Sequence, residues 1–392
     1  MLISVSRALE LILGLVTPLE EELVALEDAA GRVLARPLRA RRDQPPFAAS
    51  AMDGYAICEA DARQGKRLRI IGEAAAGKRF GGVVMPGQAV RIFTGAPVPE
   101  GAERVVIQED VERDGNTITL LTPPEASRHI RPAGADFRTG ACVSPPRRLG
   151  PADLALLAAM NINRLHVTRR PEVALVATGN ELVMPGESPG PDQIIASNAY
   201  GLKALAERVG ARGRILPIAR DDESSLRAVL EQAAGADLIV TIGGASVGDH
   251  DLVGPVAGKL GLERAFYKVA MRPGKPLMAG KLGGSILIGV PGNPVSSIVC
   301  GHVFMLPALN AMQGLPPAPA PRSRARLAHD LPENGAREHY MRARLEKDGL
   351  ISTFPRQDSA LLSVLAQADA LLIRPPGDSP RPAGSEVEYL PI

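Results

Sequence analysis

The chain has 392 residues, 45% of them hydrophobic, which is long enough for two to four domains with substantial cores. Its 45 Lys and Arg residues nearly balance its 43 Asp and Glu residues, and aromatic residues make up only 3%. This composition does not indicate nucleic-acid binding, which favours a basic surface and aromatic stacking platforms. The three cysteines lie far apart without CxxC spacing, so they indicate neither a disulfide framework nor a zinc site.

The sequence predicts a protein of the cytoplasm without a membrane anchor. No apolar run reaches membrane-spanning length, and the N-terminus lacks a basic stretch followed by a cleavable apolar core. The chain contains 40 Gly and 35 Pro residues, which is above average and indicates many turns and several β-rich modules.

The first part of the chain predicts a helix followed by a small β module. Apolar spacing over residues 4–15 is typical of an amphipathic helix, and residues 19–30 continue as a helical or turn segment. A basic, proline-containing linker follows at 39–46. Between 67 and 121, short β-type runs are separated by Gly and Pro turns, which predicts a small antiparallel module. Residues 151–160 have a good helix start, with Pro at its first position.

From residue 171 the pattern changes to alternating strands and helices. Such alternation predicts an α/β domain with a doubly wound parallel sheet and right-handed crossovers. The predicted strands are 173–177, 214–218, 238–241, 265–269 and 285–290, and the predicted helices are 198–209, 223–232, 252–260 and 294–311. A Pro-rich linker at 314–321 then leads to a small β module over 324–392.

Polar and glycine-rich loops follow the predicted strands. They comprise residues 178–181, 221–222, 243–251, 271–276 and 291–294. In an open α/β sheet, ligands bind outside the carboxyl ends of the strands, so these five loops predict one site. Gly243 and Gly244 would let backbone N–H groups approach a ligand. A tight strand-to-helix turn, with Asp251 capping the next helix, is the alternative.

Two further motifs lie in the first half of the chain. Asp53 and Gly54 interrupt small apolar residues, and by themselves they favour a turn. Arg131 and Asp136 flank a glycine, which fits a surface loop as well as a site.

Together the motifs resemble those of the MoeA-type molybdopterin molybdenumtransferase family, which includes the E domain of gephyrin. The motifs that carry the resemblance are SAMDGYA (50–56), RIFTGA (91–96), RPAGAD (131–136), ATGNEL (177–182), GGASVGDHD (243–251), RPGKP (272–276) and PGNPVS (291–296). They occur in the family's order over essentially the whole chain.

The resemblance implies a multidomain α/β fold and a homodimer. Its four domains would be a discontinuous helical domain, an inserted β domain, an α/β domain of the molybdopterin-binding type and a C-terminal β-barrel. The corresponding residues are 1–40 with 138–170, 41–137, 171–311 and 312–392. The active site would lie between the α/β domain of one subunit and the β domain of the other.

The reaction implied is insertion of molybdenum from molybdate into adenylylated molybdopterin, with release of AMP and help from Mg²⁺ or a similar cation. The catalytic residues implied are Asp53, Thr94, Asp136, Glu181 and Asp251. The substrate-binding residues implied are Ser50, Arg131, Gly243, Gly244, Ser246, Gly248, Lys268, Arg272, Lys275, Pro291 and Pro294. Carboxylates suit a divalent cation that bridges phosphates, and Glu181, Asp221 and Asp251 are the expected metal ligands. Other cofactor-synthesis proteins are expected partners, whereas nucleic acid and membranes are not.

This chain departs from the family pattern at several positions. Ala48 and Ala49 precede Ser50 where the family has Asp-Asn, and Asn180 stands where Asp is usual. These changes are also compatible with a paralogue that has reduced activity, or with one that prefers tungstate to molybdate. The sequence is also compatible with a gephyrin-like binding scaffold and with a nucleotide-pyrophosphate hydrolase. Four retained acids favour the transferase over the scaffold, and the Asp53 and Thr94 motifs favour it over the hydrolase.

Overall fold

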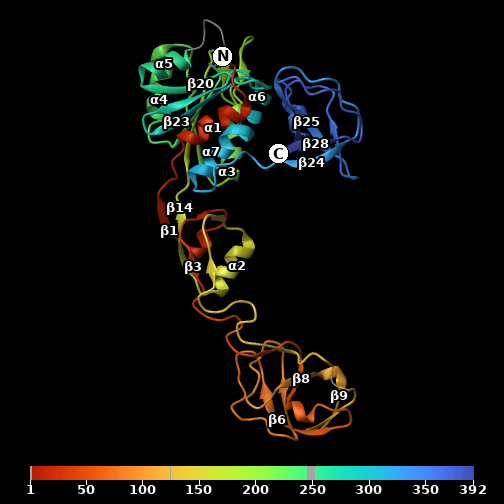
Figure 1. The fold of residues 1–392 in the computed structure, drawn as a ribbon. Helices are drawn as coiled ribbons and strands as arrows, with labels where there is room; N and C mark the ends of the chain where they lie inside the picture. Colours follow the sequence, from red (N-terminus) through yellow and green to blue (C-terminus); the bar gives the residue numbers. More distant parts are fainter. Residues whose placement is uncertain (1, 124, 245–251) are drawn as a thin grey trace.

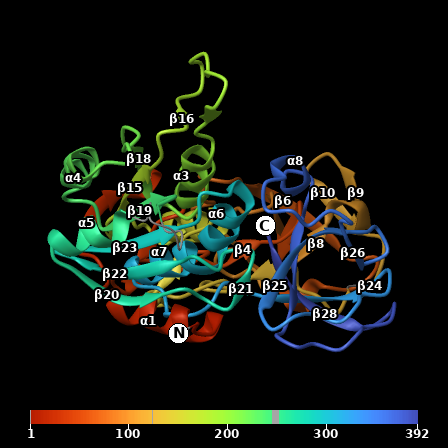
Figure 2. The ribbon, with the colours of Figure 1, turned by 90° about the horizontal axis from the view of Figure 1, so that it is seen from above.

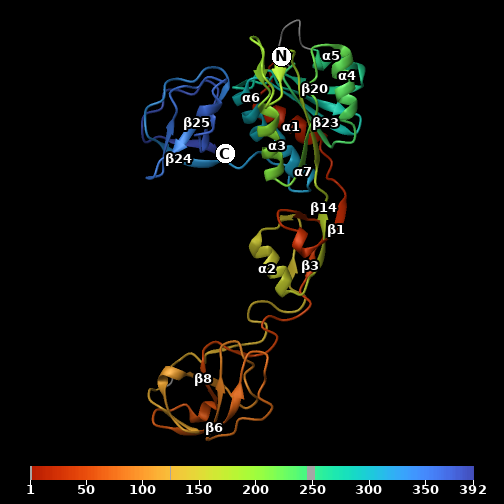
Figure 3. The same ribbon diagram turned by 180° about the vertical axis from the view of Figure 1, so that it is seen from behind.

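The computed structural model describes residues 2–123, 125–244 and 252–392. The chain is elongated (Figure 1). Its α/β part and C-terminal barrel lie side by side at one end, and a narrow ribbon connects the α/β part to a β module at the far end. Figure 3 shows the same separation from behind.

The α/β domain contains a six-stranded sheet in the order β18-β15-β19-β23-β22-β20. Its strands are β15 (Glu172–Ala177), β18 (Arg212–Ile215), β19 (Leu238–Ile242), β20 (Leu262–Tyr267), β22 (Met278–Leu282) and β23 (Ser285–Val290). The first four in this order are parallel, which confirms the predicted fold class. Strand β22 is antiparallel to both of its neighbours, β20 and β23, and Gly283 and Gly284 form the two-residue connection that returns the chain directly from β22 to β23.

Helices cover both faces of this sheet. Helices α4 (Glu223–Gln232) and α5 (Val253–Lys259) pack on one face. The other face carries α1 (Val5–Leu15), α3 (Asn198–Arg208), α6 (Pro294–Cys300) and α7 (Leu306–Met312). Helix α1 therefore belongs to the α/β core, whereas the sequence-based boundaries place residues 1–40 with residues 138–170.

A continuous helical segment runs through α6, a π-helical turn at Gly301–Met305 and α7. Within the described residues, this segment, Pro294–Met312, is the one helix whose length and composition would suffice to cross a membrane. Its most apolar window is 83% buried inside the protein, against the α/β sheet. The sequence-based statement that no apolar run reaches this length was therefore wrong, and the segment's apolar character is explained by burial in the core.

The ribbon and the small domain below it form a four-stranded sheet in the order β1-β14-β2-β13, with α2 (Pro151–Ala159) beside it. These strands are β1 (Glu21–Ala25), β2 (Val33–Leu34), β13 (Arg147–Arg148) and β14 (Arg164–Thr168). The expected helix or turn at 19–30 is instead β1 followed by a short 3-10 helix, Leu26–Asp28. Strand β1 pairs with β14, a partner more than 130 residues away that local periodicity does not indicate.

An ion pair fixes the ribbon to the α/β sheet. The guanidinium of Arg169, just after β14, donates two hydrogen bonds of 2.7 Å to the carboxylate of Asp237. Its Nε donates a third, of 2.6 Å, to Glu20 beside β1. Asp237 also accepts the backbone N–H of Glu172, at the start of β15. One side chain therefore joins both ribbon strands to the base of the parallel sheet.

The β module is a mixed six-stranded sheet in the order β8-β5-β7-β6-β10-β9. Its strands are β5 (Gly54–Ile57), β6 (Arg67–Ala74), β7 (Gln88–Ile92), β8 (Arg104–Ile107), β9 (Val111–Asp114) and β10 (Thr117–Leu120). Strands β6 and β7 are parallel, so the expectation of a purely antiparallel module was wrong. Asp53 lies in a bend, and Gly54 begins a buried central strand. A Cβ at Gly54 would lie 2.0 Å from the carbonyl oxygen of Val106, which explains the glycine.

Two further pairs of short strands lie at the edges of the β module. Strands β3 (Leu38–Arg39) and β12 (Cys142–Val143) pair where the chain enters and leaves the module. Strands β4 (Ala49–Ser50) and β11 (Ile130–Arg131) pair on its rim.

The C-terminal domain is a closed five-stranded barrel, as expected. Its strands are β24 (Ser323–Leu327), β25 (Glu338–Leu345), β26 (Leu350–Thr353), β27 (Ala370–Arg374) and β28 (Glu386–Pro391), and β25 pairs with β27 to close it. Helix α8 (Leu362–Leu365) lies outside these strands. Strand β21 (Met271–Arg272) of the α/β domain pairs with β25, which attaches the barrel to the sheet's loops.

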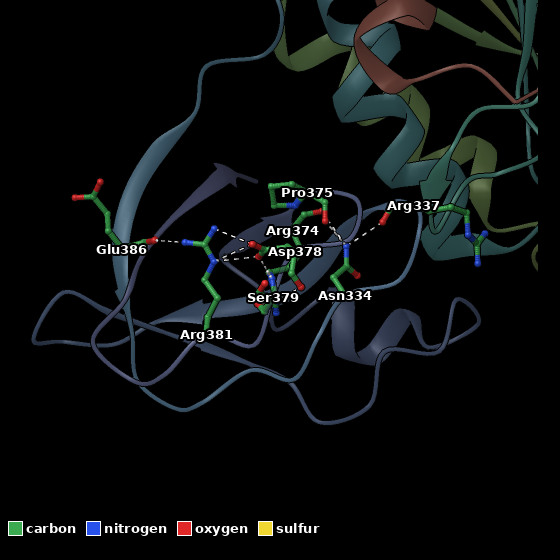
Figure 4. Close-up of polar contacts among 8 residues, drawn as sticks. All are labelled: Asn334, Arg337, Arg374, Pro375, Asp378, Ser379, Arg381 and Glu386. Atoms are coloured by element: carbon green, nitrogen blue, oxygen red, sulfur yellow. Dashed lines mark hydrogen bonds and ion pairs between the residues drawn. The ribbon is translucent and has the colours of Figure 1, made fainter.

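A charged network stabilises one end of the barrel (Figure 4). The carboxylate of Asp378 accepts hydrogen bonds from the buried Arg374 at 2.5 Å and from Arg381 at 2.9 Å. Asn334 donates to the carbonyl oxygen of Pro375 at 2.6 Å. The hydrogen bond from Arg381, together with the charges of both arginines, lowers the pKa of Asp378 below its ordinary value.

Because the pKa of Asp378 is lowered in the folded state, its ionised form stabilises the fold above the ordinary Asp pKa of about 3.9. This contribution is lost as the pH falls through the lowered pKa. We predict that Asp378→Asn lowers the free energy of unfolding at pH 7 by about 1–3 kcal/mol. The difference from the wild type should shrink at pH 3. The measurement is urea unfolding of the full chain, followed by far-UV circular dichroism.

Asp348→Asn, an exposed acid of the same barrel, serves as the control and should change little at either pH. An equal loss of stability for Asp378→Asn at pH 7 and pH 3 would show that its charge does not contribute.

Candidate functional site

A cavity of about 650 Å³ lies at the carboxyl ends of the parallel strands. Its floor is built from the segments that directly follow β15, β19 and β23, namely 177–179, 242–244 and 291–294. This is the edge at which the strand order predicts a site. Among the site residues expected from the sequence, those that line this cavity are Glu181, Asp221, Gly243, Gly244, Pro291 and Pro294.

Two glycines after β19 adopt backbone conformations that other residues rarely reach. Gly243 has φ +92° and Gly244 has φ +62°. A Cβ on Gly243 would lie 2.9 Å from the carbonyl oxygen of Thr178, and one on Gly244 would lie 2.5 Å from Val253. The turn therefore needs glycine for its conformation and for its close contact with neighbouring backbone. Ser246, Gly248 and Asp251, expected later in the same loop, lie outside the described residues.

Asn180 joins two loops of the cavity. Its backbone N–H donates to Asp221 Oδ2 at 3.0 Å, and its side-chain oxygen accepts the N–H of Asp221 at 3.1 Å. Arg220 adds a hydrogen bond to the carbonyl oxygen of Leu182 at 3.0 Å. The amide at position 180 thus has a structural role in holding Asp221 at the cavity.

Glu181 is the second carboxylate of the cavity. It lies against Gly179, where a Cβ would come within 2.3 Å of its Oε2. Within residues 2–123, 125–244 and 252–392, no three His, Cys, Asp or Glu side chains converge as a metal-binding group. Of the three expected metal ligands, two are therefore placed at one cavity, and the third, Asp251, is not described.

The three cations expected from the α/β domain, Lys268, Arg272 and Lys275, do not line the cavity. Lys268 lies over the ring of Tyr267, with Nζ 5.0 Å from the ring centre. Arg272 is exposed in β21, and Lys275 is exposed one residue before Pro276, which does line the cavity. The loop 272–276 thus borders the site, with its cations at the rim.

The remaining expected residues gather on the β module. Thr94 donates to Asp53 Oδ1 from both its backbone N–H and its hydroxyl, each at 2.7 Å. The first of these hydrogen bonds is the main cause of the lowered pKa of Asp53, which keeps that carboxylate ionised. Ser50 is fully buried, and its hydroxyl donates to the carbonyl oxygen of Met52 at 2.6 Å.

Arg131 and Asp136 line a second cavity, of about 680 Å³, beside Gly95 on the rim of the module. Within one chain the β module, to which this cavity and Asp53 belong, lies far from the α/β domain (Figures 1 and 3).

The barrel contributes residues that the sequence analysis missed. Ala360 lines the first cavity, and Ser359 accepts a hydrogen bond of 2.9 Å from Asn293. Beneath this segment, the fully buried Arg342 donates to the carbonyl oxygen of Asp358 at 3.1 Å, while its Nε has no hydrogen-bond partner among the described residues. Within the α/β domain, Asn198 was also missed, although it donates to the carbonyl oxygen of Gly292 at 2.7 Å. Its place at the start of a helix after a polar loop was an available signal.

The conformation of the glycine turn gives a direct test. We predict that Gly243→Ala lowers the free energy of unfolding by about 1–3 kcal/mol, through the strained φ and the contact with Thr178. The control is Gly258→Ala in α5, where a Cβ meets no described atom within 4 Å and helix propensity favours alanine. In urea unfolding, a Gly243→Ala protein as stable as Gly258→Ala would contradict the assignment.

Comparisons with known proteins agree with this architecture. Residues 3–161 match the MoeA N-terminal region (domain I and II), residues 174–311 a probable molybdopterin binding domain, and residues 324–392 the MoeA C-terminal region (domain IV).

Curated relatives extend over nearly the whole chain. A molybdopterin molybdenumtransferase of Nostoc sp. is 35% identical over 99% of this chain and 94% of its own length. One of Synechococcus elongatus is 34% identical over 99% of both chains. A crystal structure of the molybdopterin biosynthesis MoeA protein of Pyrococcus horikoshii OT3 superposes with a TM-score of 0.86, at 28% identity and with 100% of each chain covered. The chain therefore belongs to the MoeA family, whose curated members are molybdopterin molybdenumtransferases.

Proposed function

We propose that this protein is an enzyme of molybdenum cofactor biosynthesis that acts in the cytoplasm. It inserts molybdenum from molybdate into adenylylated molybdopterin and releases AMP. The observation that carries the proposal is the cavity at the strand ends, where a glycine turn and two carboxylates meet in a domain matched as molybdopterin-binding.

The phosphate groups of the substrate are assigned to the glycine turn. Gly243 and Gly244 form a positive-φ turn that brings backbone to the lining of the cavity, and the N–H of Gly243 is donated to the carbonyl oxygen of Val290 at 3.0 Å, which leaves the rest of the turn to face the phosphates. The cations Arg272 and Lys275 lie at the rim, from which the planar guanidinium and the ammonium attract phosphate and molybdate oxygens. The buried Arg342 adds positive charge beneath the barrel segment that borders the cavity.

Mg²⁺ is the proposed cofactor, and the residues present fit it. Glu181 and Asp221 supply carboxylate oxygens at one cavity, and Mg²⁺ characteristically combines one or two carboxylates with substrate phosphates and water. When bound, the ion would neutralise charge on the phosphoanhydride that breaks as AMP leaves. Asn180 holds Asp221 in place for this role.

The second half of the site is assigned to the partner subunit of a homodimer. Asp53, Thr94, Arg131 and Asp136 belong to the β module, which in one chain lies far from the α/β domain. A second copy would bring its β module to that cavity. The ionised Asp53 would then face the substrate's reacting end.

The overall test uses the purified full chain with adenylylated molybdopterin, Mg²⁺ and either molybdate or tungstate. AMP release and activation of a molybdenum-free apo-enzyme are measured together. We expect both to require the oxyanion, and a preference for tungstate would identify a tungsten-specific member. AMP release without any activation would favour a pyrophosphate hydrolase instead.

We predict that Asp221→Asn lowers the Mg²⁺-dependent rate of AMP release by about 100-fold, the scale of one lost electrostatic contact. The amide keeps an oxygen for the N–H of Asn180, so the fold should persist. The control is Asp222→Asn, at the neighbouring position, which caps α4 by accepting the N–H of Ser225 at 2.7 Å. Asn caps helices as well as Asp, so this variant should keep normal activity. Equal rates for both variants would exclude Asp221 from the metal site.

We predict that Asp53→Ala and Glu181→Ala proteins, each inactive alone, recover activity when their subunits are mixed and exchanged. A heterodimer would contain one site in which both residues are intact. Subunit exchange is verified with two differently tagged proteins. Mixed activity no higher than that of either variant, with exchange verified, would rule out a site shared between subunits.

A further inference from the structure

One wall of the α/β cavity is apolar. It is formed by Leu182, Ile194 and Ile195, which all line the cavity. Ile194 is 59% exposed and Ile195 is 39% exposed. Two consecutive exposed isoleucines at the mouth of a cavity are an unpartnered apolar surface, in contrast to the buried isoleucines of the neighbouring strands β19 and β23.

The residues of this wall belong to two paired strands rather than to an irregular loop. Strands β16 (Leu182–Val183) and β17 (Ile194–Ile195) pair in parallel. The N–H of Ile194 donates to the carbonyl oxygen of Glu181 at 2.8 Å, and that of Ala196 donates to Val183 at 2.9 Å. Figure 2 shows the arm that carries β16 projecting from the α/β domain beyond α3. The pairing holds both isoleucines in fixed positions at the base of this arm.

Polar groups flank the wall in the sequence. Glu181 directly precedes β16, while Ser197 and Asn198 follow β17 after one intervening residue, Ala196. All three also line the cavity. The cavity therefore places carboxylate and amide groups next to an aliphatic surface, which suits a ligand that has a charged part and a flat, uncharged part.

We propose that Leu182, Ile194 and Ile195 position the pterin ring system of the substrate, while its phosphates lie at Gly243 and Gly244. The assignment rests on the proposed function and adds the residues that select the ring. β-Branched side chains have few rotamers, so they present a fixed surface to a planar heterocycle at low entropic cost. The match of residues 174–311 to a molybdopterin binding domain favours the pterin over the adenine of the same substrate.

The test compares the wild-type full chain with the double variant Ile194→Ala/Ile195→Ala. The probes are a fluorescent pterin monophosphate, AMP and inorganic pyrophosphate, and their dissociation constants are measured by fluorescence or calorimetry. We expect the double variant to bind the pterin about tenfold more weakly, the scale of lost methylene contacts in an apolar pocket. Its affinity for pyrophosphate should be unchanged. Ile194→Leu/Ile195→Val, which keeps an aliphatic surface, should restore most of the pterin affinity.

The matched control is Val83→Ala/Met85→Ala in the β module, whose side chains are 47% and 55% exposed and line neither cavity. It should bind all three probes like the wild type. The assignment is overturned if the wall variant binds the pterin normally, if it loses AMP affinity alone, or if it loses pyrophosphate affinity equally. It is also overturned if the variant becomes monomeric while the wild type is dimeric, because the wall would then be a subunit contact.

Molybdenum insertion by the same wild-type preparation separates this inference from the proposed function. A wild type that inserts molybdenum, together with a wall variant that has normal pterin affinity and KM, overturns the wall assignment alone. A wild type that neither inserts molybdenum nor binds the pterin overturns the proposed function and the wall with it.

Discussion

The ribbon is fixed to the α/β domain by a bidentate ion pair between Arg169 and Asp237, and Arg148 of β13 adds hydrogen bonds to Val209 and Asn310. Asp237 directly precedes the central strand β19, and Arg169 directly follows the ribbon strand β14. The charges are partly shielded from water, and each carboxylate oxygen accepts a short hydrogen bond, so the geometry is well defined. The ribbon is attached at the amino end of β19, whereas the cavity lies at the carboxyl ends of the strands, and the β module lies far from the α/β domain (Figure 1).

The α/β domain and the β module, which lie far apart in one chain, present different chemical groups. The α/β domain presents glycine backbone, two carboxylates and an apolar wall, whereas the β module presents an ionised aspartate and an Arg–Asp pair beside its own cavity. For the reaction proposed above, neither set is a complete site. The barrel adds a third contribution, because Ala360 lines the α/β cavity, Ser359 accepts a hydrogen bond from Asn293, and β21 pairs with the barrel strand β25.

Local sequence patterns predicted much of this architecture. The strands that they missed are stabilised by pairing with other strands, which a local pattern does not indicate. The bounds of α4 and β23 agree with the predicted helix 223–232 and strand 285–290, because α4 has a clear apolar periodicity with Asp222 as its N-cap and β23 is a short run of buried residues. Strand β22 was missed, since its Gly-Lys interior has no β-type pattern and it is stabilised by pairing with both neighbours. Strand β1 likewise depends on a distant partner. The strand-end rule predicted the cavity's location, but it could not indicate Ala360, which lines the cavity, or Ser359, which accepts a hydrogen bond from Asn293, because both belong to a separate domain packed against it.

The pairing of β3 with β12 has a consequence for how this chain can vary. The entry and exit segments of the β module are hydrogen-bonded neighbours, Leu38–Arg39 with Cys142–Val143. An insertion whose two ends already meet can be exchanged for another of the same end-to-end spacing without altering the register of the ribbon. The β module can therefore be exchanged while the ribbon that connects it to the α/β domain stays the same. Evolution or protein engineering can change the surface that the β module presents to a neighbouring molecule while the core of the α/β domain stays the same.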